Sequence, residues 1–210
     1  MYNNCTDTDK IVLLQSSLLL GFWHSETDHV QPWYWTGISV NLCQILGLYR
    51  NPDTTRYNSA ITDRQRHLWR RLWWTCLFRD RWLSLTLGRP MRIDLNDCNM
   101  PMPSAADVLS DVDGIPPSTA AAFIPFDLPR MAEYWVSLIE MSKVLGSVLK
   151  LNYQKLRPTP SLSQVEVLEA EVLRCKPPDQ DEPDLGRLAI FYVYHLQLHY
   201  QFVFPWIYWG

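Results

Sequence analysis

The chain has 210 residues, of which 47% are hydrophobic and 20% are charged. These proportions are typical of a folded globular protein and exclude a disordered chain. The formal net charge of −3 excludes a protein that binds nucleic acid through an overall positive charge. The five cysteines form no CxxC pair, so the chain lacks the spacing of a zinc ribbon or zinc finger, and we expect no metal site in it.

Hydrophobic periodicity predicts an all-α fold. Apolar residues recur at the spacing of one helix face, and no segment alternates convincingly with the period of a strand. Thr62 or Asp63 is a suitable N-cap for the third helix, and Ser161 or Ser163 for the fifth. The sequence therefore predicts an irregular multi-helix bundle with long proline-rich loops, whose helices cover about 9–21, 32–48, 63–87, 130–155, 161–174 and 185–204.

Two segments between the predicted helices are rich in proline and acidic residues. Residues 93–129 contain six aspartates and neither Lys nor Arg, and their prolines predict a long acidic loop without a regular helix. Residues 176–184, KPPDQDEPD, are expected to be a linker. We predict one helical domain over 1–210 that is incomplete at both ends. The apolar run 11–23 is too short to cross a bilayer, and 188–209 carries His and Gln side chains, so no membrane association is expected.

The most informative segment is 64–92, RQRHLWRRLWWTCLFRDRWLSLTLGRPMR. It holds eight arginines, four tryptophans and a single carboxylate, Asp80. Spacings of four and three residues place Asp80 on one helix face with apolar residues, where an unpaired carboxylate is unfavourable. Gly88 followed by Pro90 predicts the end of this helix.

This basic segment allows two interpretations. Arginines interleaved with aromatic rings suit phosphate binding and base stacking. Internal pairing is favoured, because Arg is the usual partner of buried carboxylates. We therefore predict structural ion pairs between Asp80 and the nearest arginines, Arg79, Arg81 and Arg89.

Other candidate sites are weaker. Trp73, Trp82 and Trp135 could line a pocket for a small molecule. His195 and His199 lie four residues apart and could face one metal ion, but no third ligand is evident, so packing is the favoured interpretation. The sequence contains no phosphate-binding loop, nucleophile elbow or catalytic carboxylate pair. We therefore expect that the protein is not an enzyme.

Three segments, in order, resemble the fungal-specific transcription factor domain, the helical middle region of fungal binuclear zinc-cluster regulators. They are WTGISVNLCQILGLYRNPD at 35–53, RRLWWTCLFRDRWLSLTLGRPMRIDLNDCNMPMP at 70–103, and the predicted helix at 131–155 with the KLRPTP that follows it. The chain is closest in character to the cutinase-type regulators. The family signature falls on Arg70, Arg71, Trp73, Trp74, Asp80, Arg81, Gly88, Arg89 and Pro90.

The resemblance implies a regulatory domain that acts in the nucleus on RNA polymerase II transcription by sensing a small-molecule effector or a protein partner. Zinc and direct DNA contacts are expected only from a cluster N-terminal to this region, so this chain should hold no cofactor. The chain could also form a dimer. The alternatives are a stand-alone helical protein that binds a small molecule, or an inhibitory partner of an intact regulator.

Overall fold

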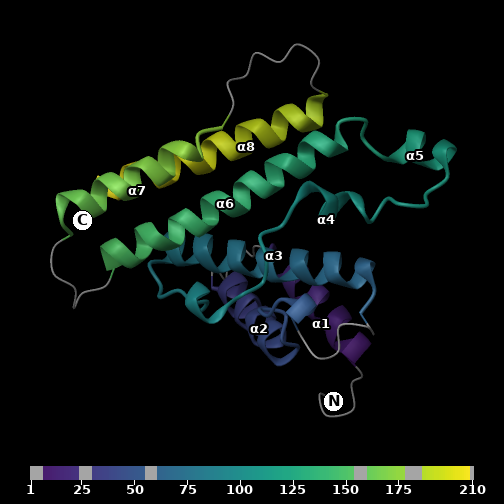
Figure 1. Ribbon diagram of the computed structural model, residues 1–210, viewed down its shortest axis with the longest axis horizontal. Coiled ribbons are helices and arrows are strands. Elements are labelled where there is room, and N and C mark those ends of the chain that lie inside the picture. The colour runs from purple at the N-terminus through teal and green to yellow at the C-terminus, as the bar shows by residue number, and fades with distance from the viewer. Residues whose placement is uncertain (1–6, 24–29, 55–60, 154–159, 178–185, 209–210) are drawn as a thin grey trace. The chain divides into compact units, whose positions relative to one another are not determined.

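The computed structural model describes residues 7–23, 30–54, 61–153, 160–177 and 186–208. Over these residues the protein is all-α, as predicted, with eight α-helices, three short 3-10 helices and no strand (Figure 1). The elements are α1 (Asp7–Leu20), α2 (Gln31–Ile45), η2 (Pro52–Thr54), α3 (Asp63–Leu87), η4 (Leu95–Asp97), α4 (Ala105–Leu109), α5 (Pro117–Phe123), α6 (Leu128–Tyr153), α7 (Leu162–Arg174), α8 (Arg187–Val203) and η5 (Phe204–Tyr208).

The chain divides into two compact units, Met1–Pro103 and Ser104–Gly210. The first contains α1 to α3 and the segment that follows α3, and the second contains α4 to α8 and η5. That both units together form the single regulatory domain expected from the sequence stays a prediction.

The first unit is a three-helix arrangement in which α2 contacts both α1 and α3. Helix α2 ends in a Schellman motif: Gly47 has φ 72°, Leu48 N–H donates to the carbonyl of Cys43, and Gly47 N–H donates to that of Gln44. This motif satisfies two carbonyls at the end of the helix. The buried side chains that join the helices include Leu14, Val40, Cys43, Leu48, Cys76 and Leu77.

Helix α3 begins and ends at the residues that its sequence indicates. Thr62 and Gln65 form a reciprocal capping box at its start, which satisfies two of the free N–H groups of the first turn. At its end Gly88 takes the left-handed conformation, with φ 61°, which glycine adopts without steric cost. Arg89 N–H then donates to the carbonyl of Ser84, and the chain turns back toward α3.

The prediction of a helix-free loop over 93–129 is wrong. The structure contains η4, α4 and α5 in this range. Helix α4 follows Ser104, which forms a capping box with Asp107, and α5 begins at Pro117. Proline is compatible with a first helical turn because its fixed φ suits the helix and no partner for its nitrogen is needed there. Helix α5 has a proline in its first turn, and Pro125 follows its end at Phe123. Helix α4 contains no proline. The predicted linker at 176–184 lies largely outside the described residues.

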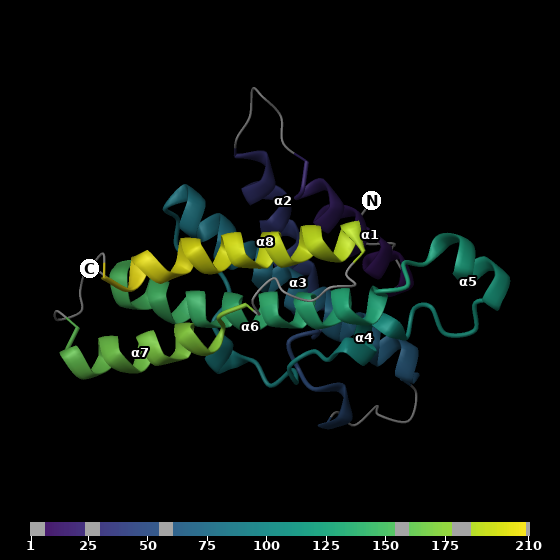
Figure 2. The same cartoon turned by 90° about the horizontal axis from the view of Figure 1, so that it is seen from above.

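In the second unit, α6 runs between α7 and α8 (Figure 2) and contacts both helices. Helix α7 starts at the predicted cap Ser161, which forms a capping box with Gln164. The core is apolar and consists mainly of one stripe from each helix, including Ile139, Met141, Leu145, Val148, Leu168, Val172, Ala189, Val193, Leu196 and Val203.

Asp127 joins the starts of two helices in this unit. Its main-chain carbonyl accepts a hydrogen bond from Met131 N–H in the first turn of α6. Its carboxylate accepts one from the N–H of Gly186, the N-cap of α8, at 3.1 Å. A negative charge is favourable at the N-terminal end of a helix. A Cβ atom at position 186 would lie 2.6 Å from Asp127 Oδ2, so any other residue there would have to displace the Asp127 carboxylate.

We expect Gly186→Ala to lower the free energy of unfolding by about 1–3 kcal/mol, because the added methyl group must displace the Asp127 carboxylate. Chemical denaturation of the two proteins measures this difference. Asp127→Ala removes the 2.6 Å contact and leaves the one with Phe126 Cε1 at 3.2 Å, so in that background the cost of Gly186→Ala should fall below about 1 kcal/mol. An equal cost in both backgrounds would contradict the assignment.

Candidate functional site

Asp80 is the centre of a buried hydrogen-bond network in the first unit. The side chain is fully buried on α3. Its Oδ2 accepts from Arg81 Nη1 at 2.8 Å and from Ile93 N–H at 3.1 Å. The N–H of Arg92 lies 3.0 Å from Oδ1 and 3.1 Å from Oδ2. One guanidinium and two backbone amides therefore compensate the cost of burying this carboxylate.

Arg81 closes the network on its other side. It is 1% exposed, and its Nη2 donates to the carbonyl of Ile93 at 2.8 Å. Both polar groups of the Ile93 backbone are thus bound by neighbouring residues of α3. Burial raises the pKa of Asp80, whereas Arg81 and the two backbone N–H groups act in the opposite direction. Burial also lowers the pKa of Arg81.

The side chain of Arg92 extends this attachment to α2. Its guanidinium carbon lies 3.4 Å from the centroid of the Trp33 ring, a cation–π contact, and Nη2 donates to the Trp33 carbonyl at 3.1 Å. Gly37 leaves room for it, because a Cβ at that position would approach Arg92 Nη2 to 3.3 Å. Arg92 therefore connects two helices: its side chain contacts Trp33 on α2, and its backbone N–H donates to Asp80 on α3.

Of the three arginines predicted to pair with Asp80, only Arg81 contacts it within the described residues. Arg79 donates to the carbonyl of Gly21 and lies 4.1 Å from the centroid of Phe22. Burial lowers its pKa to about 10. Arg89 lies over Trp33, at 5.4 Å from the ring centroid. The expected pairing of Arg79 and Arg89 with Asp80 is therefore wrong, because both guanidinium groups are directed toward other partners.

Asp80 binds the backbone N–H groups of Arg92 and Ile93 in place of Arg79 and Arg89. The sequence did not predict these two partners. A backbone N–H gives no residue-specific signal. The indication that could have been used is the break at Gly88 and Pro90, which turns the chain back along α3 and brings the following amides within reach of an acid on that helix.

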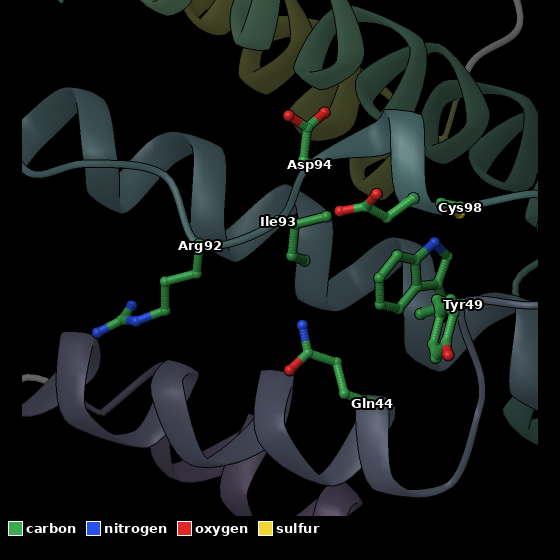
Figure 3. Close-up of a pocket in the computed structure, with 8 residues that line it drawn as sticks. Gln44, Tyr49, Arg92, Ile93, Asp94 and Cys98 are labelled. Atoms are coloured by element: carbon green, nitrogen blue, oxygen red, sulfur yellow. The ribbon is translucent and has the colours of Figure 1, made fainter.

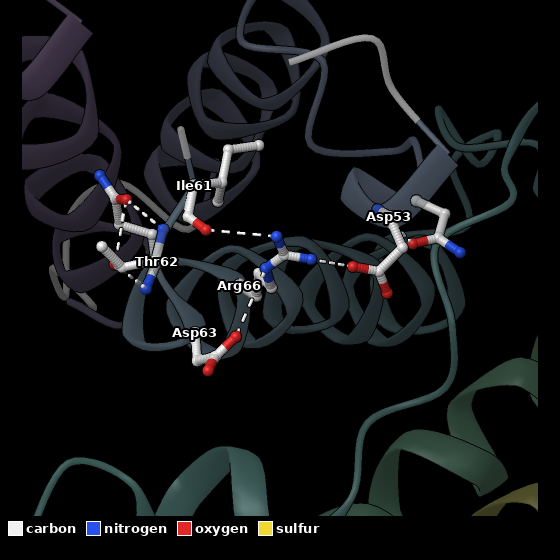
Figure 4. A network of polar contacts seen from close by, with 7 residues as sticks. Asp53, Ile61, Thr62, Asp63 and Arg66 are labelled. Atoms are coloured by element: carbon white, nitrogen blue, oxygen red, sulfur yellow. Dashed lines mark hydrogen bonds and ion pairs between the residues drawn. The ribbon is translucent and has the colours of Figure 1, made fainter. Parts of the chain in front are cut away.

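In the first turn of α3, Arg66 also binds groups within the protein (Figure 4). Arg66 forms an ion pair with Asp53 and lies 3.6 Å from the carboxylate of Asp63. It also donates to the carbonyl of Ile61 at 3.2 Å. Arg79, Arg81, Arg89 and Arg92 of the basic segment 64–92 likewise contact groups inside the protein. These contacts are consistent with arginine side chains that pair inside the protein rather than bind nucleic acid.

A pocket with a volume of about 320 Å³ adjoins the Asp80 network (Figure 3). Figure 3 shows Gln44 projecting from α2 toward Ile93, and the guanidinium of Arg92 extending away from Tyr49 and Cys98. The lining combines aromatic, charged and amide groups, a mixture found in sites for small polar molecules. These residues are Gln44, Tyr49, Trp73, Arg92, Ile93, Asp94, Asp97 and Cys98.

The aromatic end of this pocket is formed by Tyr49 and Trp73, whose ring centroids are 6.2 Å apart. Of the predicted pocket residues, Trp73 belongs to the lining, whereas Trp82 is buried beside Phe78. Trp135 lies in the second unit, so a pocket formed by all three tryptophans stays a prediction. The other seven lining residues were not predicted from the sequence. Two of them, Gln44 and Tyr49, come from a part of the chain remote from 92–98.

A further hydrogen bond lies within the segment 70–103 that resembles the family, which we call the signature string. Trp74 Nε1 donates to the carbonyl of Pro101 at 2.7 Å, which holds the proline-rich end of the string against α3. Gly88 supplies the turn, Asp80 and Arg81 bind the segment after it, and Pro90 lies between the turn and that segment. The string thus describes one helix together with the chain that folds back on it.

The structure also bears on metal and membrane sites. Over the described residues, no group of three or more His, Cys, Asp or Glu side chains is arranged to hold a metal ion. His195 and His199 lie with ring centroids 4.2 Å apart, and burial lowers the pKa of His199 to about 4. Among the helices that the structure describes, none is long and apolar enough to cross a membrane.

Comparison with known proteins identifies the class. The model of the fungal specific transcription factor domain matches residues 1–176. Cutinase transcription factor 1 beta of Fusarium vanettenii is 30% identical over 162 residues, which cover 74% of this chain and 18% of that protein. The acetamidase regulatory protein of Emericella nidulans is 33% identical over 128 residues, or 59% of this chain and 15% of that protein. No solved structure gives a significant match.

This chain belongs to the fungal specific transcription factor domain family, as the order of its signature residues predicted. It is a regulatory domain of the kind found in fungal transcription factors, and the cutinase-type likeness is confirmed. The matches cover less than a fifth of the length of these relatives, 18% and 15% in the two cases above.

Proposed function

We propose that the first unit is an effector-responsive element of a transcription regulator that acts in the nucleus. A small polar molecule would enter the pocket beside Asp80 and change how the segment 89–98 is held. DNA contacts would come from a separate module. The relatives named transcription factors and regulatory proteins support this proposal, and they favour a regulator over an enzyme.

The observation that carries the proposal is that the pocket and the buried network share residues. Arg92 and Ile93 line the pocket, and their backbone amides donate to Asp80. A ligand that touches these residues competes directly with the contacts that attach the segment to α2 and α3. Ligands shift an equilibrium only through such a difference in contacts between two states.

The experiment attaches the 210-residue chain to an unrelated DNA-binding module and measures reporter transcription in fungal cells. We expect Arg92→Ala to change reporter output at least several-fold at unchanged protein level, because it removes a side chain that lines the pocket and donates to the Trp33 carbonyl. Arg89→Ala is the matched control, since Arg89 also lies over Trp33 but is not part of the pocket lining. Equal output from both variants, or an effect explained entirely by lower protein abundance, would refute the proposal.

A further inference from the structure

Two cysteine thiols meet in the buried contact between α2 and α3. Cys43 lies near the end of α2, and Cys76 lies in the middle of α3. Their Sγ atoms are 3.4 Å apart, and both side chains are 0% exposed. Both residues belong to the first unit, so the contact is a property of that unit alone.

Hydrogen bonds of the neighbouring chain hold both thiols in place. The carbonyl of Cys43 accepts from Leu48 N–H in the motif that ends α2. On α3, Cys76 lies one turn before Asp80, whose carboxylate binds the segment that folds back on the helix. Two reacting groups that a fold holds next to each other behave as if they were present at very high concentration. A bond between these sulfurs needs a local shift, from 3.4 Å to about 2 Å.

We propose that Cys43 and Cys76 are a modification site, at which a hydroperoxide forms a disulfide between α2 and α3. The hydroperoxide transfers one oxygen to the first thiolate, which becomes a sulfenic acid, and leaves as an alcohol, or as water if it is hydrogen peroxide. The second thiol then attacks the sulfenic sulfur. The S–O bond breaks, the S–S bond forms, and water leaves with the proton of that thiol. The two thiols thereby lose two electrons and two protons, and the hydroperoxide takes them up.

The closed contact protects the thiols from this reaction. Neither is exposed, and burial, together with the hydrogen bond to Cys43, raises the pKa of Cys76. Buried, protonated thiols react slowly. Oxidation of the first thiol therefore needs a transient opening between α2 and α3, and reclosure brings the second thiol to the sulfenic sulfur. The disulfide then prevents the two helices from opening again.

The cross-link would act on the attachment that the proposed effector changes. Arg92 joins the same two helices through Trp33 on α2 and Asp80 on α3. A disulfide between α2 and α3 would keep these helices together when that attachment is released. The inference does not rest on the effector, because the reaction needs only the two thiols and the oxidant.

Counting free thiols before and after oxidation tests the inference. Cys5→Ser, Cys98→Ser and Cys175→Ser together leave Cys43 and Cys76 as the only thiols of the 210-residue chain, and we call this variant the pair-only protein. The folded protein is treated with hydrogen peroxide, unfolded in denaturant and alkylated with N-ethylmaleimide, and mass spectrometry counts the alkylated cysteines. We expect two before oxidation, none after it, and two again after reduction with dithiothreitol, which reverses a disulfide but not a sulfinic acid.

The melting temperature shows whether the native fold accommodates the bond. Oxidation should raise that of the pair-only protein by several degrees, because a cross-link restricts the unfolded chain, and reduction should reverse the rise. The matched control is the pair-only protein with Cys76→Ala, which cannot form an internal disulfide and whose melting temperature peroxide should not raise. An equal rise in the control, or a disulfide that lowers the melting temperature, would contradict the proposal.

The wild-type chain provides a test without any substitution. Proteolysis of the oxidised, folded protein without reductant should release two peptides joined through Cys43 and Cys76. Other cysteine pairings in place of this one would overturn the inference. Persistence of both thiols in the folded protein, under an exposure that oxidises them in the unfolded chain, would overturn it as well, because the pair would then serve only as buried packing.

Discussion

Asp80→Ala should lower the free energy of unfolding of the first unit by about 3–5 kcal/mol, the usual cost of removing one partner from a buried ion pair. The substitution leaves Arg81, which is 1% exposed, without its carboxylate. It also removes the acceptor of the Arg92 and Ile93 amides. Chemical denaturation followed by circular dichroism measures the difference from the wild type.

Asp63→Ala is the matched control for this substitution. Asp63 lies on the same helix and also contacts an arginine, at 3.6 Å, but its side chain is 93% exposed. Exposed ion pairs contribute little, and this change should alter stability by less than about 0.5 kcal/mol. If Asp80→Ala and Asp63→Ala gave the same unfolding curve as the wild type, the buried network would have no structural role.

Trp73→Ala should have an effect of similar size, about 3–5 kcal/mol, because it removes a large aromatic side chain from a packed position. Trp73 is only 2% exposed, although one of its faces contributes to the pocket. The ring is therefore mainly a core residue, and its removal should both destabilise the first unit and enlarge the pocket. The unfolding free energy of the variant measures the first of these effects.

Trp23→Ala provides the comparison for the tryptophan. Trp23 lies in the same unit but is 66% exposed, so its removal should cost less than about 0.5 kcal/mol. Equal losses at the two positions would contradict the assignment of Trp73 to the core. A stable Trp73→Ala protein would instead indicate that the ring borders an open cavity.

Sequence periodicity predicted the long helices because their apolar stripes and caps are local signals. Thr62 with Gln65 and Ser161 with Gln164 are capping boxes that can be identified by residue type and spacing. The prolines of 93–129 predict a loop, but the first turn of α5 accommodates Pro117, and the five residues of α4 lie between prolines and contain none.

The candidate site could be predicted only in part. The position of Asp80 on an apolar face indicated a buried carboxylate, and Arg81 was among the partners expected for it. The direction of each guanidinium depends on tertiary neighbours: Arg79 reaches Gly21, and Arg92 reaches Trp33. Such contacts join residues far apart in the chain, and residue spacing along one helix contains no information about them.

Amide hydrogen exchange at Arg92 and Ile93 tests the central claim most directly, because both N–H groups are assigned to the Asp80 carboxylate rather than to water. The account predicts that in the wild type these two amides exchange about a hundredfold or more slowly than unprotected peptide amides. In Asp80→Ala they should lose more protection than amides in the core of α3. Exchange of both wild-type amides at the rate of an unprotected peptide would contradict the claim that Asp80 holds this segment.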